Sequence, residues 1–333
     1  MSKAAPTEAG TTRLHVVTGK GGTGKSTMAG ALALALARAG RRVLLCEVEG
    51  RQGIAQLFGR DPMPYAEERI GSGPDGEGDL YGLSIDARSA MEEYLRLYYR
   101  LGGPAGRLME RFGVTDFATT LAPGLRDVLL TGKVYEAVDR NPRNRAAIVY
   151  DDVVLDGPPT GRIVQFLLVN GEFGDLAKVG AVRNQTEKVM ALLRSDRTAV
   201  HVTTLLEDMP VRETAEGVAE LRAAGLPVGQ VLVNQIQPRE LDPWLADSLD
   251  GTLPMDRVGA ELVSVGVATT DDVLAGLARD AQGLAERRSL EAAEEARIEA
   301  LGVPLARFPE LPGGIDPAAL GELAMQMRKQ GLA

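Results

Sequence analysis

The stretch Gly19-Lys20-Gly21-Gly22-Thr23-Gly24-Lys25-Ser26-Thr27 decides the fold because of what stands on either side of it. An apolar run at residues 14–18 precedes it, and an Ala- and Leu-rich run at residues 28–39 follows it. This order predicts a buried strand, a glycine loop and a helix. Glycines let a backbone come close to an anion, and a helix N-terminus adds positive potential at the same point. The stretch is therefore typical of a loop that binds nucleotide phosphates.

The pattern G-x-x-x-x-G-K-[ST] gives the residues of this loop separate expected roles. The backbone N–H groups of residues 21–24 are expected to surround the phosphates. Lys25 is expected to reach the β- and γ-phosphates and Ser26 to bind Mg²⁺. Thr27 is expected to bond a phosphate nearer the ribose. The sequence thus predicts a nucleotide and Mg²⁺ as cofactors.

Composition excludes several classes of partner. The chain has 333 residues and is 44% hydrophobic, which is enough for one large α/β domain or two small ones. Its net charge of -9, without a block of basic residues, argues against binding to nucleic acid or to anionic lipid. A single cysteine, Cys46, leaves neither an internal disulfide nor a zinc cluster. With no long apolar run and a polar N-terminus, the chain is expected to be cytoplasmic.

The loop carries a second lysine, Lys20, directly after its first glycine. The pattern K-G-G-x-G-K-[ST] resembles the deviant Walker A loop of the family that contains MinD, ParA, the nitrogenase iron protein, ArsA and the eukaryotic tail-anchored-protein targeting ATPase. The resemblance implies ATP as the nucleotide. In that family the first lysine crosses a dimer interface to the partner's nucleotide, so the resemblance implies this role for Lys20. The alternative is a lysine that only faces solvent.

A second phosphate-site element is predicted around Asp156. Apolar residues lead up to Asp156, and Gly157-Pro158-Pro159-Thr160-Gly161 follows it. An aspartate at the end of such a strand holds Mg²⁺ through a water in P-loop proteins. The string resembles the second switch, Asp-x-x-Pro-Thr-Gly, of ArsA and its targeting relatives. MinD and ParA lack this ending, so the resemblance favours the ArsA branch.

Glu49 departs from the family's pattern. It follows a predicted buried strand at 43–48, where an open parallel sheet places its working loops. Counting back from Leu57-Phe58-Gly59 aligns Glu49 with the Asp that orients the attacking water in the first switch of ArsA-like proteins. With its extra methylene, Glu49 is interpreted as a slow base, a relic or a residue reset by a partner, because a displacement of about 1 Å can cost on the order of a hundredfold in rate. The alternative is a glutamate that only caps the segment from Gly53.

Three further residues are expected near the adenine. Asn234 ends a predicted strand and resembles the family's adenine-reading asparagine, whose amide pairs with both donor and acceptor edges. The alternative for Asn234 is a turn at the end of a strand. Pro309 and Leu311 lie in a segment that resembles the loop closing over adenine in this family.

The predicted fold is α/β, a doubly wound and mostly parallel P-loop sheet with an inserted helical subdomain. Residues 1–12 are expected to form a disordered tail, and residues 13–333 a single ATPase domain. Helical insertions are expected at about 87–145 and 170–197, with core packing preferred over a cargo groove. The glycine- and proline-rich connection 60–79 is expected to be an irregular surface loop.

Two features outside the loops also yield expectations. A long helix over 271–301 is predicted to make apolar contacts through residues that include Leu274 and Leu277. His15 and His201 fall in predicted central strands and are interpreted as structural.

The resemblance implies an ATP-hydrolysing dimeric switch that couples its nucleotide state to a partner or to membrane-protein or small-ligand cargo. The second chain is expected to be either an identical copy or a paralogous ArsA-like subunit, and membrane contact to be indirect. One alternative is the ATPase subunit of an arsenite-type efflux pump, which the lone Cys46 supports poorly. Another is a nearly inactive nucleotide-dependent chaperone. The second insertion contains a single methionine, Met190, which disfavours a plastic groove for a transmembrane segment.

Overall fold

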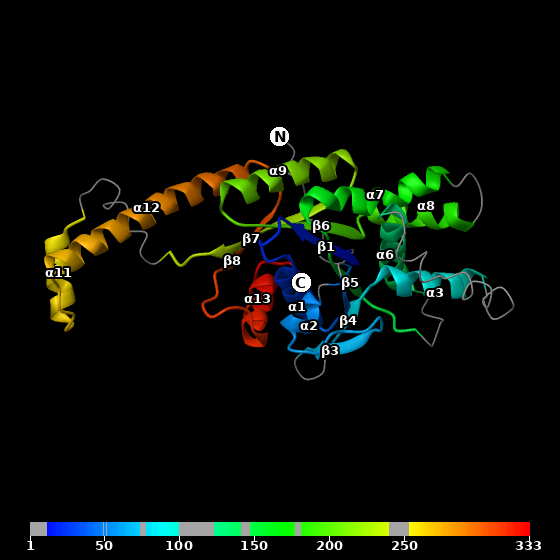
Figure 1. The fold of residues 1–333 in the computed structure, drawn as a ribbon, viewed down its shortest axis with the longest axis horizontal. Helices are drawn as coiled ribbons and strands as arrows, with labels where there is room; N and C mark the ends of the chain where they lie inside the picture. The colour runs from blue at the N-terminus through cyan, green and yellow to red at the C-terminus, as the bar shows by residue number, and fades with distance from the viewer. Residues whose placement is uncertain are drawn as a thin grey trace.

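An eight-stranded sheet forms the centre of the computed structural model, which describes residues 12–48, 50, 52–73, 78–99, 123–140, 147–176, 181–239 and 253–333 (Figure 1). The strand order is β3-β4-β2-β5-β1-β6-β7-β8. The strands are β1 (Leu14–Gly19), β2 (Arg42–Glu47), β3 (Glu68–Ser72), β4 (Asp79–Ser84), β5 (Asp152–Asp156), β6 (Thr198–Thr204), β7 (Val228–Ile236) and β8 (Leu305–Pro309). Only β3 and β4 pair antiparallel. The predicted doubly wound, mostly parallel sheet is confirmed.

Helices cover both faces of this sheet (Figure 1). They are α1 (Lys25–Arg38), α2 (Gly53–Leu57), α3 (Ala87–Tyr99), α6 (Pro123–Val138), α7 (Thr160–Leu176), α8 (Ala181–Leu193), α9 (Asp208–Ala223), α11 (Met255–Ser264), α12 (Asp271–Glu299) and α13 (Pro317–Lys329). Successive strand residues point to opposite faces of the sheet. Val17 therefore belongs to the buried cluster with α1 and α13, whereas Val16 belongs to the cluster with α6, α7 and α9. The central strands are buried on both faces, which explains their almost continuous apolar sequences.

Strand β3 corrects the expectation of an irregular loop over residues 60–79. Residues 68–72 pair with β4, and the register shifts between Arg69 and Gly71. Ile70 is buried, so this edge strand has one anchor in the core. Its short length and its glycine hid the pairing from sequence reasoning.

The described parts of the two helical insertions pack against the sheet. Leu130 and Val134 of α6, and Val189 and Leu193 of α8, belong to one buried cluster with residues of β1 and β5. The preference for core packing over a cargo groove concerned the first insertion, where Met91 of α3 also packs against this cluster. Residues 100–122 and 141–146 of the first predicted insertion lie outside the described residues, as do residues 1–11 of the predicted tail.

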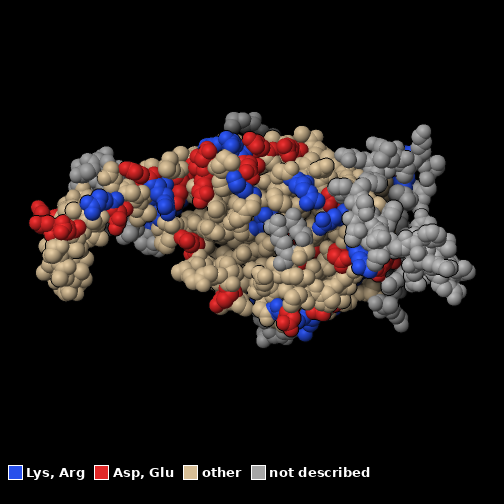
Figure 2. Space-filling model, viewed as in Figure 1, with Lys and Arg blue, Asp and Glu red and all other residues tan. Residues whose placement is uncertain are grey.

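An arm, formed by α11 and the first half of α12, extends away from the sheet (Figure 1). The predicted contact at Leu274 exists, since its side chain lies against Gly259 of α11. Leu277 is 39% exposed, so any apolar contact at this position covers only part of its surface. Val263 and Val265 are exposed as well, and Figure 2 shows uncharged surface beside acidic atoms at the far end of the arm. In the described part of the chain, no helix is both long and apolar enough to span a membrane.

Candidate nucleotide-binding site

Two glycines let the loop after β1 come close to other backbone and side-chain atoms. A Cβ on Gly19 would lie 2.3 Å from the backbone oxygen of Thr203, and one on Gly24 would lie 2.4 Å from Nδ2 of Asn234. Both glycines have positive φ, 153° and 90°. Any other residue at either position would force the loop away from β6 or β7, so the shape of the loop depends on both glycines.

The carbonyl oxygen of Lys20 organises the interior of the loop. It accepts hydrogen bonds from the Thr23 hydroxyl at 2.9 Å, from the Thr23 N–H at 3.3 Å and from Lys25 Nζ at 3.4 Å. Lys25 is only 8% exposed. Its ammonium group is therefore held inside the loop, at the N-terminus of α1, where backbone N–H groups and the helix dipole favour an anion.

Two oxygen-bearing side chains meet at the mouth of the loop. The Ser26 hydroxyl donates to Oδ2 of Asp156 at 2.5 Å, although the two residues are 130 positions apart. The sheet order causes this contact, because β5 lies next to β1 and Asp156 pairs with Val17. Serine and carboxylate oxygens are ligands that Mg²⁺ prefers.

The turn after Asp156 is tied to β1. The Thr18 hydroxyl donates to the carbonyl of Pro158 at 2.7 Å, and the N–H of Gly157 donates to the carbonyl of Val17 at 2.9 Å. The segment that resembles the second switch thus starts from the same strand that feeds the glycine loop.

Beyond this turn, an ion pair between an exposed arginine and a buried aspartate links α7 to the first insertion. Arg162 Nη2 donates to both carboxylate oxygens of Asp127 on α6, at 2.9 and 3.0 Å. Asp127 is buried. About two turns further along α7, Asn170 donates to the Thr131 hydroxyl of α6 at 2.6 Å. Two side-chain contacts, Arg162 with Asp127 and Asn170 with Thr131, therefore connect α7 to α6.

Lys20 forms an ion pair with Glu213 of α9 within the same chain. The distance from Lys20 Nζ to Glu213 Oε1 is 2.9 Å, and both side chains are about one third exposed. An exposed pair of this kind contributes little to stability, typically below about 1 kcal/mol. Lys20 is therefore neither buried nor free in solvent, and this contact can be broken at low cost.

The residues expected at the adenine have separate positions. Asn234 is buried and its amide donates to the carbonyl of Thr23 at 2.9 Å, so it braces the glycine loop from β7. Pro309 ends β8 in register with Ile236, and Leu311 packs beside the core under α1. Thr27 lies in the first turn of α1. The adenine and phosphate roles of these residues stay predictions.

Glu49 lies outside the described residues, but its neighbours define the base of its loop. Glu47, at the end of β2, is buried and accepts hydrogen bonds from the N–H of Gln52 at 3.0 Å, from the N–H of Ile54 at 3.2 Å and from the Ser84 hydroxyl at 2.9 Å. This carboxylate fixes both ends of the loop between β2 and α2.

Sequence reasoning missed Glu47, Gln52, Asp127 and Glu213. Glu47 carried a usable signal, since a charged residue at the end of an apolar strand needs partners when it is buried. For Asp127 and Glu213 the sequence carries no such signal, because each acts through a residue far away in the chain, on another helix or loop.

The assembled residues fit a nucleotide with Mg²⁺. A Cβ added to Gly21 or Gly22 would meet no atom within 4 Å, so this part of the loop is open, and the Lys25 ammonium is held in the same loop. Ser26 and Asp156 add oxygen ligands at its mouth. In the described part of the chain, no cluster of three or more His, Cys, Asp or Glu residues is arranged for a metal.

Comparison with known proteins agrees with this geometry. The family model described as anion-transporting ATPase matches residues 12–194. The ATPase BagA of Mycobacterium tuberculosis is 49% identical over 321 residues, covering 96% of this chain and 94% of that protein. The ATPase GET3B of Arabidopsis thaliana is 25% identical over 293 residues, covering 71% and 70%. An arsenical pump-driving ATPase of Escherichia coli is 26% identical over 238 residues, covering 71% and 36%. The chain belongs to the ArsA family of anion-transporting ATPases.

Proposed function

We propose that this protein is an ATP-hydrolysing switch that works as a pair of chains, with a nucleotide at the interface between them. The observation that carries the proposal is the contact between Ser26 and Asp156 at 2.5 Å, at the mouth of a glycine loop that encloses Lys25. This arrangement supports a Mg²⁺-ATP complex, in which the metal neutralises phosphate charge.

Each residue has a defined task in this proposal. Lys25 and the N–H groups of the loop hold the phosphates, while Ser26 and Asp156 hold the metal. Glu49 orients the attacking water, with slow turnover expected from its extra methylene. Asn234 braces the loop from the adenine side, and Pro309 and Leu311 border the base.

The ion pair between Lys20 and Glu213 supports the role in the dimer. We propose that Lys20 leaves Glu213 when a second chain presents its nucleotide, because the γ-phosphate carries more negative charge than one carboxylate. The exchange costs little, since the pair is partly exposed. The second chain is either an identical copy or a paralogous subunit.

The wider assignment rests on the same site. Residues 13–333 act as one ATPase domain in the cytoplasm, and the insertions at 87–145 and 170–197 respond to the nucleotide and handle a partner, a membrane protein or a small ligand. Contact with a membrane runs through that partner. Arsenite-type chemistry is not part of the proposal, because Cys46 is fully buried and burial raises the pKa of its thiol.

ATP turnover and sedimentation of the purified chain test the proposal. We expect slow Mg²⁺-dependent hydrolysis that Glu49→Asp raises, and a dimer that forms with Mg²⁺-ATP. Lys20→Ala should abolish this dimer, whereas Lys188→Ala, at an exposed lysine of α8, should leave it intact. An unchanged dimer in Lys20→Ala would contradict the role of Lys20, and unchanged turnover in Glu49→Asp would contradict that of Glu49.

A further inference from the structure

Gln52 combines a strained backbone with an unusually well-bonded side chain. Its φ and ψ are 55° and 29°, in the left-handed region that costs a residue other than glycine on the order of 1 kcal/mol. Its amide oxygen accepts from the N–H of Met63 at 2.8 Å, and its amide nitrogen donates to the carbonyl of Met63 at 3.2 Å. Together with the bond to Glu47, these contacts hold Gln52 in this conformation.

Met63 begins a short segment that we call the strap, residues 63–67, between α2 and β3. The backbone of Met63 is hydrogen-bonded to the side chain of Gln52, which follows Glu49 in the loop after β2. Met63 is 4% exposed, so this junction is part of the core and not a loose surface contact. A change in the backbone of Gln52 would therefore move the strap.

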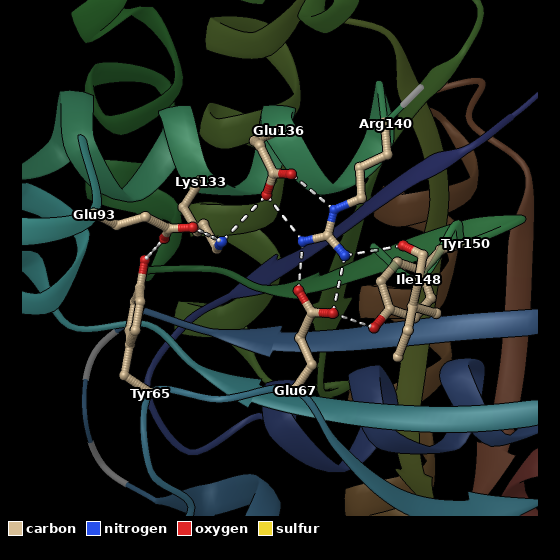
Figure 3. A network of polar contacts seen from close by, with 8 residues as sticks. All are labelled: Tyr65, Glu67, Glu93, Lys133, Glu136, Arg140, Ile148 and Tyr150. Carbon is tan, nitrogen blue, oxygen red and sulfur yellow. Dashed lines mark hydrogen bonds and ion pairs between the residues drawn. The ribbon is translucent and has the colours of Figure 1, made fainter. Parts of the chain in front are cut away.

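The other end of the strap enters a network of charged side chains (Figure 3). Tyr65 donates to Glu93 of α3 at 2.5 Å, and Lys133 of α6 binds the same carboxylate at 2.8 Å. Arg140, just after α6, pairs with Glu67 of the strap.

The network continues beyond the strap. Arg140 also pairs with Glu136 of α6 at 2.8 Å, and Tyr150, ahead of β5, donates to Glu67 at 2.7 Å. The strap thus joins α3, α6 and the start of β5.

The network is stiff because its two cations are largely buried and each is paired with carboxylates. The side chains of Arg140 and Lys133 are 7% and 10% exposed. Burial alone would raise the pKa of Glu67, but the hydrogen bonds from Arg140 and Tyr150 outweigh it and hold this pKa below its ordinary value. Separating such a pair leaves an uncompensated buried charge, so the strap and α6 are expected to move together.

We propose that Gln52 is a positioning residue that couples the loop after β2 to the first helical insertion through the strap. The inference rests on the proposed ATPase function and names how the state of the site is communicated. The two-state element is Gln52 itself, because leaving the left-handed conformation relieves its strain and breaks its bonds to Met63. The coupling is reciprocal, so a partner that binds α3 and α6 also biases the loop that carries Glu49.

Hydrogen exchange of the purified full chain, with and without Mg²⁺ and a non-hydrolysable ATP analogue, tests this coupling. In the wild type we expect the analogue to change exchange in the strap and in α6 several-fold. Gln52→Gly permits the same backbone angles but removes the amide, so it should keep analogue affinity within about threefold and lose the response of α6. Gln56→Ala, at an exposed amide of α2, should keep both.

A second variant tests the far end of the strap. Tyr65→Phe removes only the hydroxyl bonded to Glu93 and should weaken the response of α3 to the analogue. Tyr135→Phe removes a hydroxyl of α6 that bonds Asp139, and it should leave the response of α3 unchanged. A wild type that does not bind the analogue would overturn the proposed function. A wild type that binds it without a response in α6, a full response in Gln52→Gly, or loss of binding in that variant would overturn the coupling alone.

Discussion

The two ends of strand β5 carry the same residue in opposite circumstances. Asp156 stands at the carboxyl end, next to a glycine loop, and touches Ser26. Asp152 stands four residues earlier at the amino end, where its carboxylate meets Arg41 at 2.5 Å and faces His15 at 3.5 Å. Both lie on β5, between β2 and β1, yet only Asp156 has a glycine loop and a helix N-terminus beside it.

The amino-end cluster continues from Asp152 into two neighbouring imidazoles. Nδ1 of His201 accepts from the N–H of Gln230 at 3.2 Å, so its Nε2 carries the hydrogen and donates to Nδ1 of His15 at 3.3 Å. This leaves the Nε2 hydrogen of His15 facing Asp152. The cluster joins β7, β6, β1 and β5. Both histidines are buried, and the structural role interpreted for them from the sequence stays a prediction.

The comparison teaches that position in the fold, and not residue type, decides which aspartate acts on a ligand. Carboxyl ends of parallel strands open into loops and helix N-termini, whereas amino ends receive the chain from helix C-termini. Substitutions at the carboxyl end should therefore change nucleotide chemistry, and substitutions at the amino end should change stability.

The largest expected effect is at the carboxyl end. Lys25→Ala should lower ATP turnover about a thousandfold, because a charge buried in the loop is lost where phosphate charge must be stabilised. Steady-state phosphate release measures this. Lys188→Ala, which removes an equal charge from the surface of α8, should leave turnover unchanged, and equal losses in the two variants would contradict the assignment of the loop.

Asp152→Asn should act in the opposite way and lower the free energy of unfolding by about 3 kcal/mol, because Arg41 and His15 lose a buried partner. Urea unfolding measures the loss, and ATP affinity of the remaining folded protein should match the wild type. A variant of unchanged stability but impaired ATP binding would remove the distinction between the two ends.

The amino-end cluster also predicts a dependence of stability on pH. Burial, followed by the nearby His15, lowers the pKa of His201 to about 3. Since an unfolded histidine titrates near pH 6.5, the unfolded state binds the extra proton and stability falls as pH drops from about 6.5 towards 3. His201→Gln should reduce the slope of unfolding free energy against pH in this window by up to about 1.4 kcal/mol per pH unit. An unchanged slope would show that His201 is protonated in the folded chain.

The smallest expected effect concerns the brace of the glycine loop. Asn234→Ala removes the bond to the carbonyl of Thr23 and should weaken ATP affinity about tenfold, equivalent to one hydrogen bond of about 1.4 kcal/mol. Isothermal titration with ATP and with inorganic triphosphate separates two roles. If Asn234 braces the loop, Asn234→Ala weakens the affinity for both ligands. If Asn234 reads adenine, the substitution weakens the affinity for ATP alone.

Local patterns predicted the carboxyl end well. The strand, glycine loop and helix around Lys25 are contiguous, and Asp156 follows from an apolar run that ends in a carboxylate. The sequence could not predict the bond from Lys20 to Glu213, nor the pair of His15 with His201, because these contacts depend on which strands and helices become neighbours. The edge strand β3 was missed for a related reason, since a single buried anchor, Ile70, gives too little alternation to reveal it.

The dependence of ATP affinity on Mg²⁺ tests the central claim most directly. We would measure affinity by calorimetry, with Mg²⁺ and with a chelator, for the wild type, Asp156→Asn and Asp152→Asn. The account predicts that Mg²⁺ strengthens binding about tenfold or more in the wild type and in Asp152→Asn, and has little effect in Asp156→Asn. An equal Mg²⁺ effect in all three proteins would contradict it, since the two ends of β5 would then not differ in function.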